Sequence, residues 1–269
     1  MGALKLRSLF VSDVHLGTRD ARVEYLLDLL RQVECENLFL VGDVFDIWKM
    51  RGGRWHWPAL NTELLQQVMD MAARGTKVIY IPGNHDEFFR DYVGSLIAGV
   101  QVEQEWEHRL ADGRRALLLH GDEFDCVVRH NRLLKLIGNA GYEVLMLMNR
   151  ASNHLRRRLG LSYWSLSASL KRQVANAMEY VRKFEDAALH HAHERGVEVI
   201  VCGHIHHASL REEGGITYAN TGDWVEHCTA LVEHGDGRLE LMRWAEQSMA
   251  LLDTARSSDA PKAAAGVTA

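Results

Sequence analysis

Five short segments of this sequence end an apolar run with side chains that can bind metals or carry protons. They are VSDVHLG, LVGDVFD, IPGNHDE, LLHGDEFD and VCGHIHH, and glycine lies close to the polar residues in each. Carboxylate, amide and imidazole groups without a thiolate suit Mn²⁺, Fe or Zn²⁺. A single D-x-H or H-x-H pair is commonly structural, but five such segments in order favour a shared site. The candidate ligands are Asp13, His15, Asp43, Asn84, His120, His204 and His206.

The segments that precede these side chains predict an α/β fold. Apolar runs at 6–12, 37–43 and 77–84 alternate with helical patterns at 21–33 and 59–75, which is typical of βαβ units in a mostly parallel sheet. A hairpin is expected over 105–122 with its turn at 111–113, and a further buried strand over 197–204. Because the carboxyl ends of parallel strands form the ligand crevice of such sheets, the five segments are expected to meet there.

The stretch 124–195 interrupts this alternation and predicts a helical insertion, or cap, in a core made of 1–123 and 196–244. Between Arg129 and Lys183 the chain has eleven Lys or Arg and only two Glu, interleaved with apolar residues, so the rest of the chain is strongly acidic. Basic and apolar side chains together suit phosphates, anionic headgroups or acyl chains, although a solvated helix surface would look the same. The polar segment 245–269 is expected to be a disordered tail.

Composition excludes several classes of protein. The 269 residues carry a net charge of −5, which argues against a nucleic-acid partner. No apolar run reaches the roughly 18 residues of a membrane span, and no signal peptide pattern is visible at the N-terminus. The four cysteines show no C-x-x-C spacing and are expected to be reduced. A cytoplasmic protein is therefore expected.

The ordered set D-x-H, G-D, G-N-H-D, H-G-D and G-H-x-H resembles the signature of the calcineurin-like metallophosphoesterases. The resemblance covers about residues 6–244 without the insertion. It implies a four-layer α/β/β/α sandwich and two divalent metals. Mn²⁺ is the expected metal, with Fe or Zn²⁺ as alternatives. The resemblance also implies that one metal is bound by Asp13, His15, Asp43 and His206, and the other by Asp43, Asn84, His120 and His204.

The resemblance implies a reaction as well as a site. Two cations roughly 3.5–4 Å apart, bridged by the Asp43 carboxylate, lower the pKa of a bridging water, and the resulting hydroxide attacks phosphorus without a covalent enzyme intermediate. By the same resemblance His85 is not a ligand. Its imidazole is expected to act as the catalytic acid toward the leaving group, held charged by Asp46 or Asp86.

Within that superfamily, SDVHLG, GDVFDIW, HGDEFD and the insertion resemble the UDP-2,3-diacylglucosamine hydrolases of lipid A biosynthesis. This implies a nucleotide-sugar lipid that is split into a lipid monophosphate and UMP, and peripheral contact with the anionic inner face of a membrane. Candidate substrate contacts are Trp48 and, in the cap, Arg156, Arg157 and Arg158. Those hydrolases have G-N-R-D where this chain has His85, so a paralogous phosphodiesterase or phosphomonoesterase, for example on cyclic nucleotides, is the alternative.

The role of a few residues near the motifs has two interpretations. Trp48, Trp55 and Trp57 could form an aromatic wall beside the metals or simply pack over a long loop. Asp46 and Asp122 could orient metal-binding histidines, although for Asp122 capping of a local turn is an equal alternative. The residues Phe88 and Phe89 are expected to begin a helix packed on the core.

Overall fold

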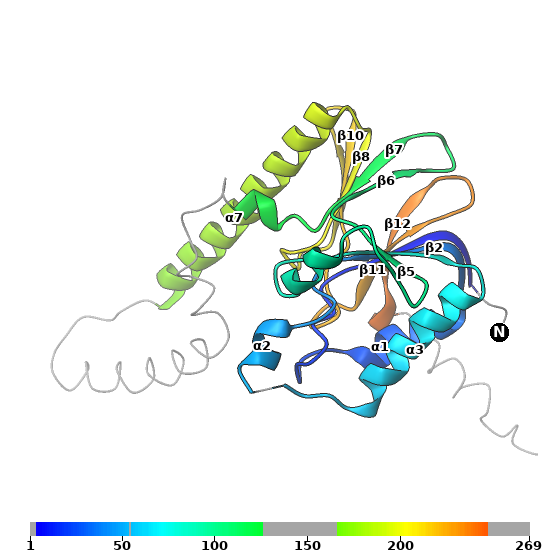
Figure 1. Ribbon diagram of the computed structural model, residues 1–269. Coiled ribbons are helices and arrows are strands. Elements are labelled where there is room, and N and C mark those ends of the chain that lie inside the picture. The colour runs from blue at the N-terminus through cyan, green and yellow to red at the C-terminus, as the bar shows by residue number, and fades with distance from the viewer. Residues whose placement is uncertain (1–3, 54, 126–165, 247–269) are drawn as a thin grey trace, which may run out of the picture. The chain divides into compact units, whose positions relative to one another are not determined.

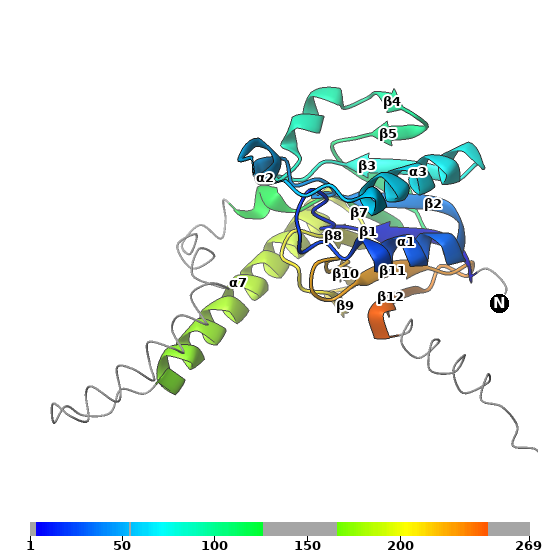
Figure 2. The same ribbon diagram turned by 90° about the horizontal axis from the view of Figure 1, so that it is seen from below.

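Four parallel strands form the centre of a seven-stranded sheet in the computed structural model, which describes residues 4–53, 55–125 and 166–246. The strand order is β12-β11-β1-β2-β3-β5-β4, with antiparallel strands only toward the two edges (Figure 2). The strands are β1 (Leu4–Val11), β2 (Val33–Val41), β3 (Lys77–Ile81), β4 (Leu96–Ile97), β5 (Val100–Val102), β11 (Thr229–Glu233) and β12 (Leu239–Arg243).

A second sheet of five strands packs against the first, in the order β6-β7-β8-β10-β9. In this sheet β7, β8 and β10 are parallel, whereas β6 and β9 run antiparallel at the edges. The strands are β6 (Trp106–Arg109), β7 (Arg115–Leu118), β8 (Val199–Cys202), β9 (Ser209–Glu213) and β10 (Ile216–Asn220). Each sheet therefore has its own set of parallel strands.

The central strands read as continuous apolar runs because both of their faces are buried. Along β2, Phe39 and Val41 point into the core between the sheets, while Leu38 and Leu40 pack on the opposite face. That opposite face is covered by α1 (Val23–Gln32) and α3 (Ala59–Ala73), as Figure 1 shows. The predicted α/β class with two stacked sheets is confirmed.

Most predicted elements are present, with shifted ends. The hairpin of β6 and β7 turns as expected, and Gly113 adopts φ 92° there. β2 begins at Val33, directly after α1, because its first residues pair with β1 from Leu4 onward. The helix expected at Phe88 is a short 3-10 helix, η1 (Glu87–Tyr92), whose Phe88 side chain is 44% exposed while Phe89 packs on the core. The expectation of a core-packed helix is thus correct only for Phe89.

The chain divides into two compact units, Met1–Asp122 with Ala192–Ala269, and Glu123–His191. The second unit contains the end of η2 (Asp122–Phe124) and most of α7 (Leu166–Arg195). Within it the Tyr180 hydroxyl donates to Asp125 Oδ1 at 2.8 Å. Most of the predicted cap and nearly all of the predicted tail lie outside the described residues. Among the described helices, none combines the length and the apolarity that crossing a membrane requires.

A buried carboxylate, Glu233 at the end of β11, connects the two sheets. It accepts hydrogen bonds from the Arg7 guanidinium, the Ser8 hydroxyl, the His108 ring at 2.8 Å and the Ala111 amide at 2.9 Å. Burial alone would raise the pKa of Glu233, but these hydrogen bonds outweigh it and lower the pKa to about 2. The ionised carboxylate therefore stabilises the folded state.

Replacing this carboxylate should destabilise the fold in a pH-dependent way. We expect Glu233→Gln to lower the free energy of unfolding by about 1–3 kcal/mol at pH 7. Because the folded pKa lies below the ordinary 4.5, the wild-type advantage is present above pH 4.5 and is lost as the pH falls toward 2. Urea unfolding of both proteins at several pH values measures the gap, and a gap that stays constant from pH 7 to pH 3 would contradict this role.

Candidate metal centre

The parallel strands of both sheets end at the same edge of the sandwich and bring the predicted ligands together there. Five strands contribute, three from the larger sheet and two from the smaller. Asp13 and His15 follow β1, Asp43 follows β2, Asn84 follows β3, His120 follows β7, and His204 and His206 follow β8. Backbone hydrogen bonds tie these loops to one another, with Asp13 N donating to Gly42 O at 3.0 Å and Gly203 N to His120 O at 3.1 Å.

The backbone at these positions is strained in a consistent way. Positive φ is uncommon for residues other than glycine and costs roughly 1–2 kcal/mol each. Such strain persists where surrounding contacts fix it, and it is concentrated at functional sites. Five predicted ligands have positive φ: Asp13 (53°), His15 (53°), Asp43 (52°), His204 (69°) and His206 (53°).

At several positions the close approach of a predicted ligand side chain requires glycine, and Gly42 and Gly83 are two of them. A Cβ on Gly42 would collide with the His120 ring, and one on Gly83 would collide with the Asp43 carboxylate. Gly42 also has φ 83°, a conformation that favours glycine for a second reason. The glycines beside the motifs therefore let ligand side chains from neighbouring strands lie against the backbone.

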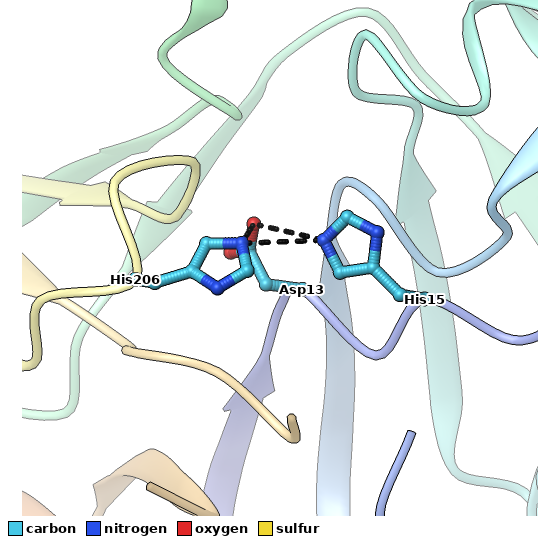
Figure 3. Close-up of side chains that lie close together, drawn as sticks. All are labelled: Asp13, His15 and His206. Atoms are coloured by element: carbon cyan, nitrogen blue, oxygen red, sulfur yellow. Dashed lines mark hydrogen bonds and ion pairs between the residues drawn. The ribbon is translucent and has the colours of Figure 1, made fainter. Parts of the chain in front are cut away.

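The first group of ligand atoms comprises Asp13, His15 and His206, whose side chains point toward one another (Figure 3). His206 Nε2 lies 3.1 Å from Asp13 Oδ1 and 3.2 Å from His15 Nε2. The other oxygen, Asp13 Oδ2, accepts from the Ser12 hydroxyl and from His204 N at 2.9 Å. Asp13 is thus held by one oxygen and offers the other to the histidines.

The second group comprises Asp43, His120 and His204, all buried. Asp43 Oδ1 lies 3.4 Å from His120 Nε2 and accepts from His85 N at 2.8 Å. Asp43 Oδ2 lies 3.8 Å from His15 Nε2, a member of the first group. The carboxylate of Asp43 therefore faces both groups, one oxygen toward each.

The electrostatics of the site favour positive charge. Burial alone would lower the pKa of His120, but Asp43 and then Asp13 outweigh it and raise the pKa to about 10. Burial would raise the pKa of Asp13, yet His206 and His120 outweigh it and lower the pKa to about 2. The pKa of Asp43 is likewise lowered, because His120 and His15 overcome its desolvation. The buried carboxylates thus stabilise positive charge on the neighbouring imidazoles.

The residues present fit divalent metals. Asn84 Oδ1 and His120 Nε2 are buried and have no hydrogen-bond partner among the described residues. Buried polar atoms are nearly always satisfied, because leaving one without a partner costs roughly 1–3 kcal/mol. The donor set consists of imidazole nitrogens and carboxylate and amide oxygens, which suits Mn²⁺, Fe or Zn²⁺. A metal ligated by these atoms would satisfy them.

His85, the predicted catalytic acid, lies beside the first group. Its ring stands edge-on to His15 at 4.7 Å, and its Nδ1 lies 3.4 Å from Asp46 Oδ1. Asp46 Oδ2 lies 3.6 Å from His15 Nδ1, so the Asp46 carboxylate contacts both histidines. It also caps the N-terminus of α2 (Ile47–Arg51). The second carboxylate considered for holding His85, Asp86, points elsewhere. Trp48 covers His85, with ring centroids 4.2 Å apart.

The other predicted contacts have mixed outcomes. Asp122 pairs with Arg90 at 2.8 Å, which gives it a role other than orienting a histidine. Trp48 and Trp55 are 50% and 57% exposed, whereas Trp57 packs against the core. The three arginines predicted to contact substrate, Arg156, Arg157 and Arg158, lie outside the described residues.

A sixth strand end, that of β10, also contributes polar residues and was not among the predicted segments. Asn220 Nδ2 donates to Gly203 O at 2.7 Å, and the Thr221 hydroxyl bonds Ser12 at 2.5 Å. Asp223 is fully buried and accepts from the Val225 amide at 2.9 Å. The segment YANTGD has the same form as the five recognised segments, an apolar run followed by polar residues and glycine, and could have been found by that rule.

The chain is similar to known proteins along most of its length. The family model described as calcineurin-like phosphoesterase matches residues 6–208. Two similar curated proteins are UDP-2,3-diacylglucosamine hydrolases. The protein of Neisseria meningitidis serogroup B is 25% identical over 85% of this chain and 94% of the relative. The protein of Psychromonas ingrahamii is 24% identical over 88% of this chain and 97% of the relative. A solved phosphoesterase from E. coli aligns over 88% of this chain and 98% of its own, with 15% identity and a TM-score of 0.43.

The position of Asp43 between the groups predicts an asymmetry between two variants. Asp43→Ala should weaken metal binding at both positions, since each loses a ligand, whereas Asp13→Ala should affect mainly one. Elemental analysis of the purified variants after loading with Mn²⁺ measures this. Two metals per chain and normal turnover in Asp43→Ala would show that the assignment is wrong.

Proposed function

The chain belongs to the calcineurin-like phosphoesterase family, and on that basis we propose that it is a two-metal hydrolase of the UDP-2,3-diacylglucosamine pyrophosphatase type. The observation that carries the proposal is the Asp43 carboxylate, which faces one histidine-containing group with each oxygen. The products would be a lipid monophosphate and UMP. Mn²⁺ is the proposed metal, with Fe and Zn²⁺ as alternatives.

Each group would hold one cation, and Asp43 would be shared by both. The first set is Asp13, His15, Asp43 and His206; the second is Asp43, Asn84, His120 and His204. When bound, such a pair supplies an activated water and neutralises charge that develops on the phosphate oxygens. The chain itself contributes fixed ligands, because the strained loops and short backbone hydrogen bonds leave these side chains little freedom.

His85 would transfer a proton to the leaving oxygen. It is half-buried beside the first group, its Nδ1 faces Asp46, and Trp48 restrains the ring. A histidine next to cations tends to lose its proton unless a carboxylate holds it charged. Asp46 is buried, and its own pKa is lowered because hydrogen bonds with His15 and His85 outweigh its desolvation, so it places a negative charge beside His85.

The relatives and the basic, apolar segment between Arg129 and Lys183 support the proposed substrate class. A nucleotide-sugar lipid has phosphates for the cations and acyl chains for the apolar residues. An exposed indole at Trp48, next to the site, could contact the base or an acyl chain. Such a substrate would place the protein in the cytoplasm, in peripheral contact with an anionic membrane surface.

One residue favours a second candidate function. His85 stands where the lipid A hydrolases named in the sequence resemblance have arginine. The broader superfamily has histidine at this position, as this chain does. A phosphodiesterase or phosphomonoesterase acting on a smaller ester, such as a cyclic nucleotide, is therefore the alternative.

The role of His85 predicts a dependence on the leaving group. His85→Ala should keep both metals and lose roughly 10²–10⁴-fold in kcat, because proton transfer to the leaving oxygen is lost. The loss should be smallest for esters with good leaving groups, such as p-nitrophenyl esters, since these need no proton. A variant that loses metal together with activity would make His85 structural, and an equal loss for all leaving groups would exclude it as the acid.

The substrate class can be tested with the Mn²⁺-loaded protein. We expect UDP-2,3-diacylglucosamine to be hydrolysed with a higher kcat/KM than UDP-N-acetylglucosamine or cyclic AMP. Reversing Arg156, Arg157 and Arg158 to Glu should raise KM for the acylated substrate and weaken sedimentation with anionic liposomes, with little effect on bis-p-nitrophenyl phosphate. Preference for the cyclic nucleotide would favour the alternative, and equal losses on both substrates would indicate a folding defect.

A further inference from the structure

Asp86 follows His85 in the GNHDE segment, but its side chain turns away from every group described above. It is fully buried and occupies the N-terminal position of η1, where an aspartate ordinarily caps the following turn. Its carboxylate makes no such capping bond. We infer that Asp86 is a positioning residue, which fixes the Asp43 loop against the Asn84 loop and so sets the geometry of the shared metal ligands.

The contacts of the carboxylate join the two loops directly. Asp86 Oδ1 accepts from Gly83 N at 2.6 Å, on the loop that follows β3. Asp86 Oδ2 accepts from Val44 N at 2.7 Å and from Phe45 N at 3.1 Å, on the loop that follows β2. The bonds from Gly83 N and Val44 N are shorter than the roughly 2.9–3.0 Å that is usual for N–H···O hydrogen bonds. One side chain therefore holds both loops, one with each oxygen.

The amides that Asp86 fixes flank the candidate ligands on both loops. Val44 follows Asp43, and Gly83 precedes Asn84. Two further bonds cross between the loops, from His85 N to Asp43 Oδ1 at 2.8 Å and from Ile47 N to His85 O at 3.1 Å. A shift of either loop would therefore change the distance between the Asp43 carboxylate and the Asn84 amide oxygen, the two oxygen ligands of the second set.

The chemistry of these contacts requires a carboxylate. Its three backbone partners are N–H donors, and the neighbouring Tyr80 hydroxyl can also donate, so both side-chain oxygens accept. An asparagine has the same shape but presents an NH₂ group to one of the loops. That NH₂ group and the backbone N–H of the loop are both donors, so the buried backbone amide would lose its hydrogen-bond partner. Asp86→Asn therefore releases one loop while leaving the volume of the core unchanged. A glutamate keeps both oxygens, but its extra methylene displaces them.

This inference rests on the proposed function, because it assigns Asp86 a part in holding that metal centre. Residues that orient metal ligands typically change metal affinity or activity by 10- to 100-fold when replaced. A residue needed only for folding would instead lower stability and leave the affinity of the folded protein unchanged. Glu233→Gln provides the matched control, since Glu233 is also a fully buried carboxylate that accepts a backbone amide, but at the His108 cluster between the sheets.

The test compares Mn²⁺ binding by calorimetry and the Tm of the metal-free protein in wild type, Asp86→Asn and Glu233→Gln. We expect Asp86→Asn to bind Mn²⁺ at least 10-fold more weakly and to lose kcat on bis-p-nitrophenyl phosphate, which saturating Mn²⁺ restores only in part. Glu233→Gln should lower Tm but keep the Kd for Mn²⁺ within about twofold of wild type.

Three results would overturn the inference. One is an unchanged Kd in folded Asp86→Asn, and another is a loss of affinity in Glu233→Gln as large as that in Asp86→Asn. If Asp86→Asn does not fold, Asp86→Glu is measured in its place. A Kd for Mn²⁺ equal to that of wild type in Asp86→Glu is then the third result that would overturn the inference. A wild-type protein that binds no Mn²⁺, Fe²⁺ or Zn²⁺ would instead refute the proposed function itself, so the two failures are distinguishable.

Discussion

The position of one carboxylate, that of Asp43, governs the arrangement of the whole site. Its two oxygens face different histidines, His15 on one side and His120 on the other. Asp43 lies at φ 52°, its amide neighbours are tied to Asp86, and Gly83 has no Cβ because the carboxylate occupies that space. Buried charges of this density are stable only when opposite charge is near, so the fold and the cations would depend on each other.

The two-sheet architecture explains how one carboxylate can face both groups. Each sheet contains parallel strands, and in a parallel sheet the polar side chains that follow the strands collect at one edge. Packing the sheets face to face brings those two edges together, so β1, β2 and β3 supply one side of the site and β7 and β8 the other. Asp43, at the end of a central strand, lies where the two sides meet.

Much of this could be predicted from the sequence, because glycine and polar residues after apolar runs mark strand ends directly. The same rule would have found Asn220 and Asp223 after β10. Other features depend on tertiary contacts and leave no local signal. From the sequence, Asp86 is expected to act on its neighbour His85, yet its carboxylate accepts from the amide of Val44, 42 residues away. The start of β2 at Val33 likewise depends on pairing with β1, which overrides the helical pattern of the preceding residues.

The proposed sharing of the Asp43 carboxylate by two metals can be measured directly. The most direct measurement is the anomalous scattering from a crystal of the Mn²⁺-loaded protein, recorded at the manganese edge. Two peaks about 3.5–4 Å apart are expected, with one Asp43 oxygen directed at each. A single peak, or two peaks of which one lacks Asp43 as a ligand, would contradict it.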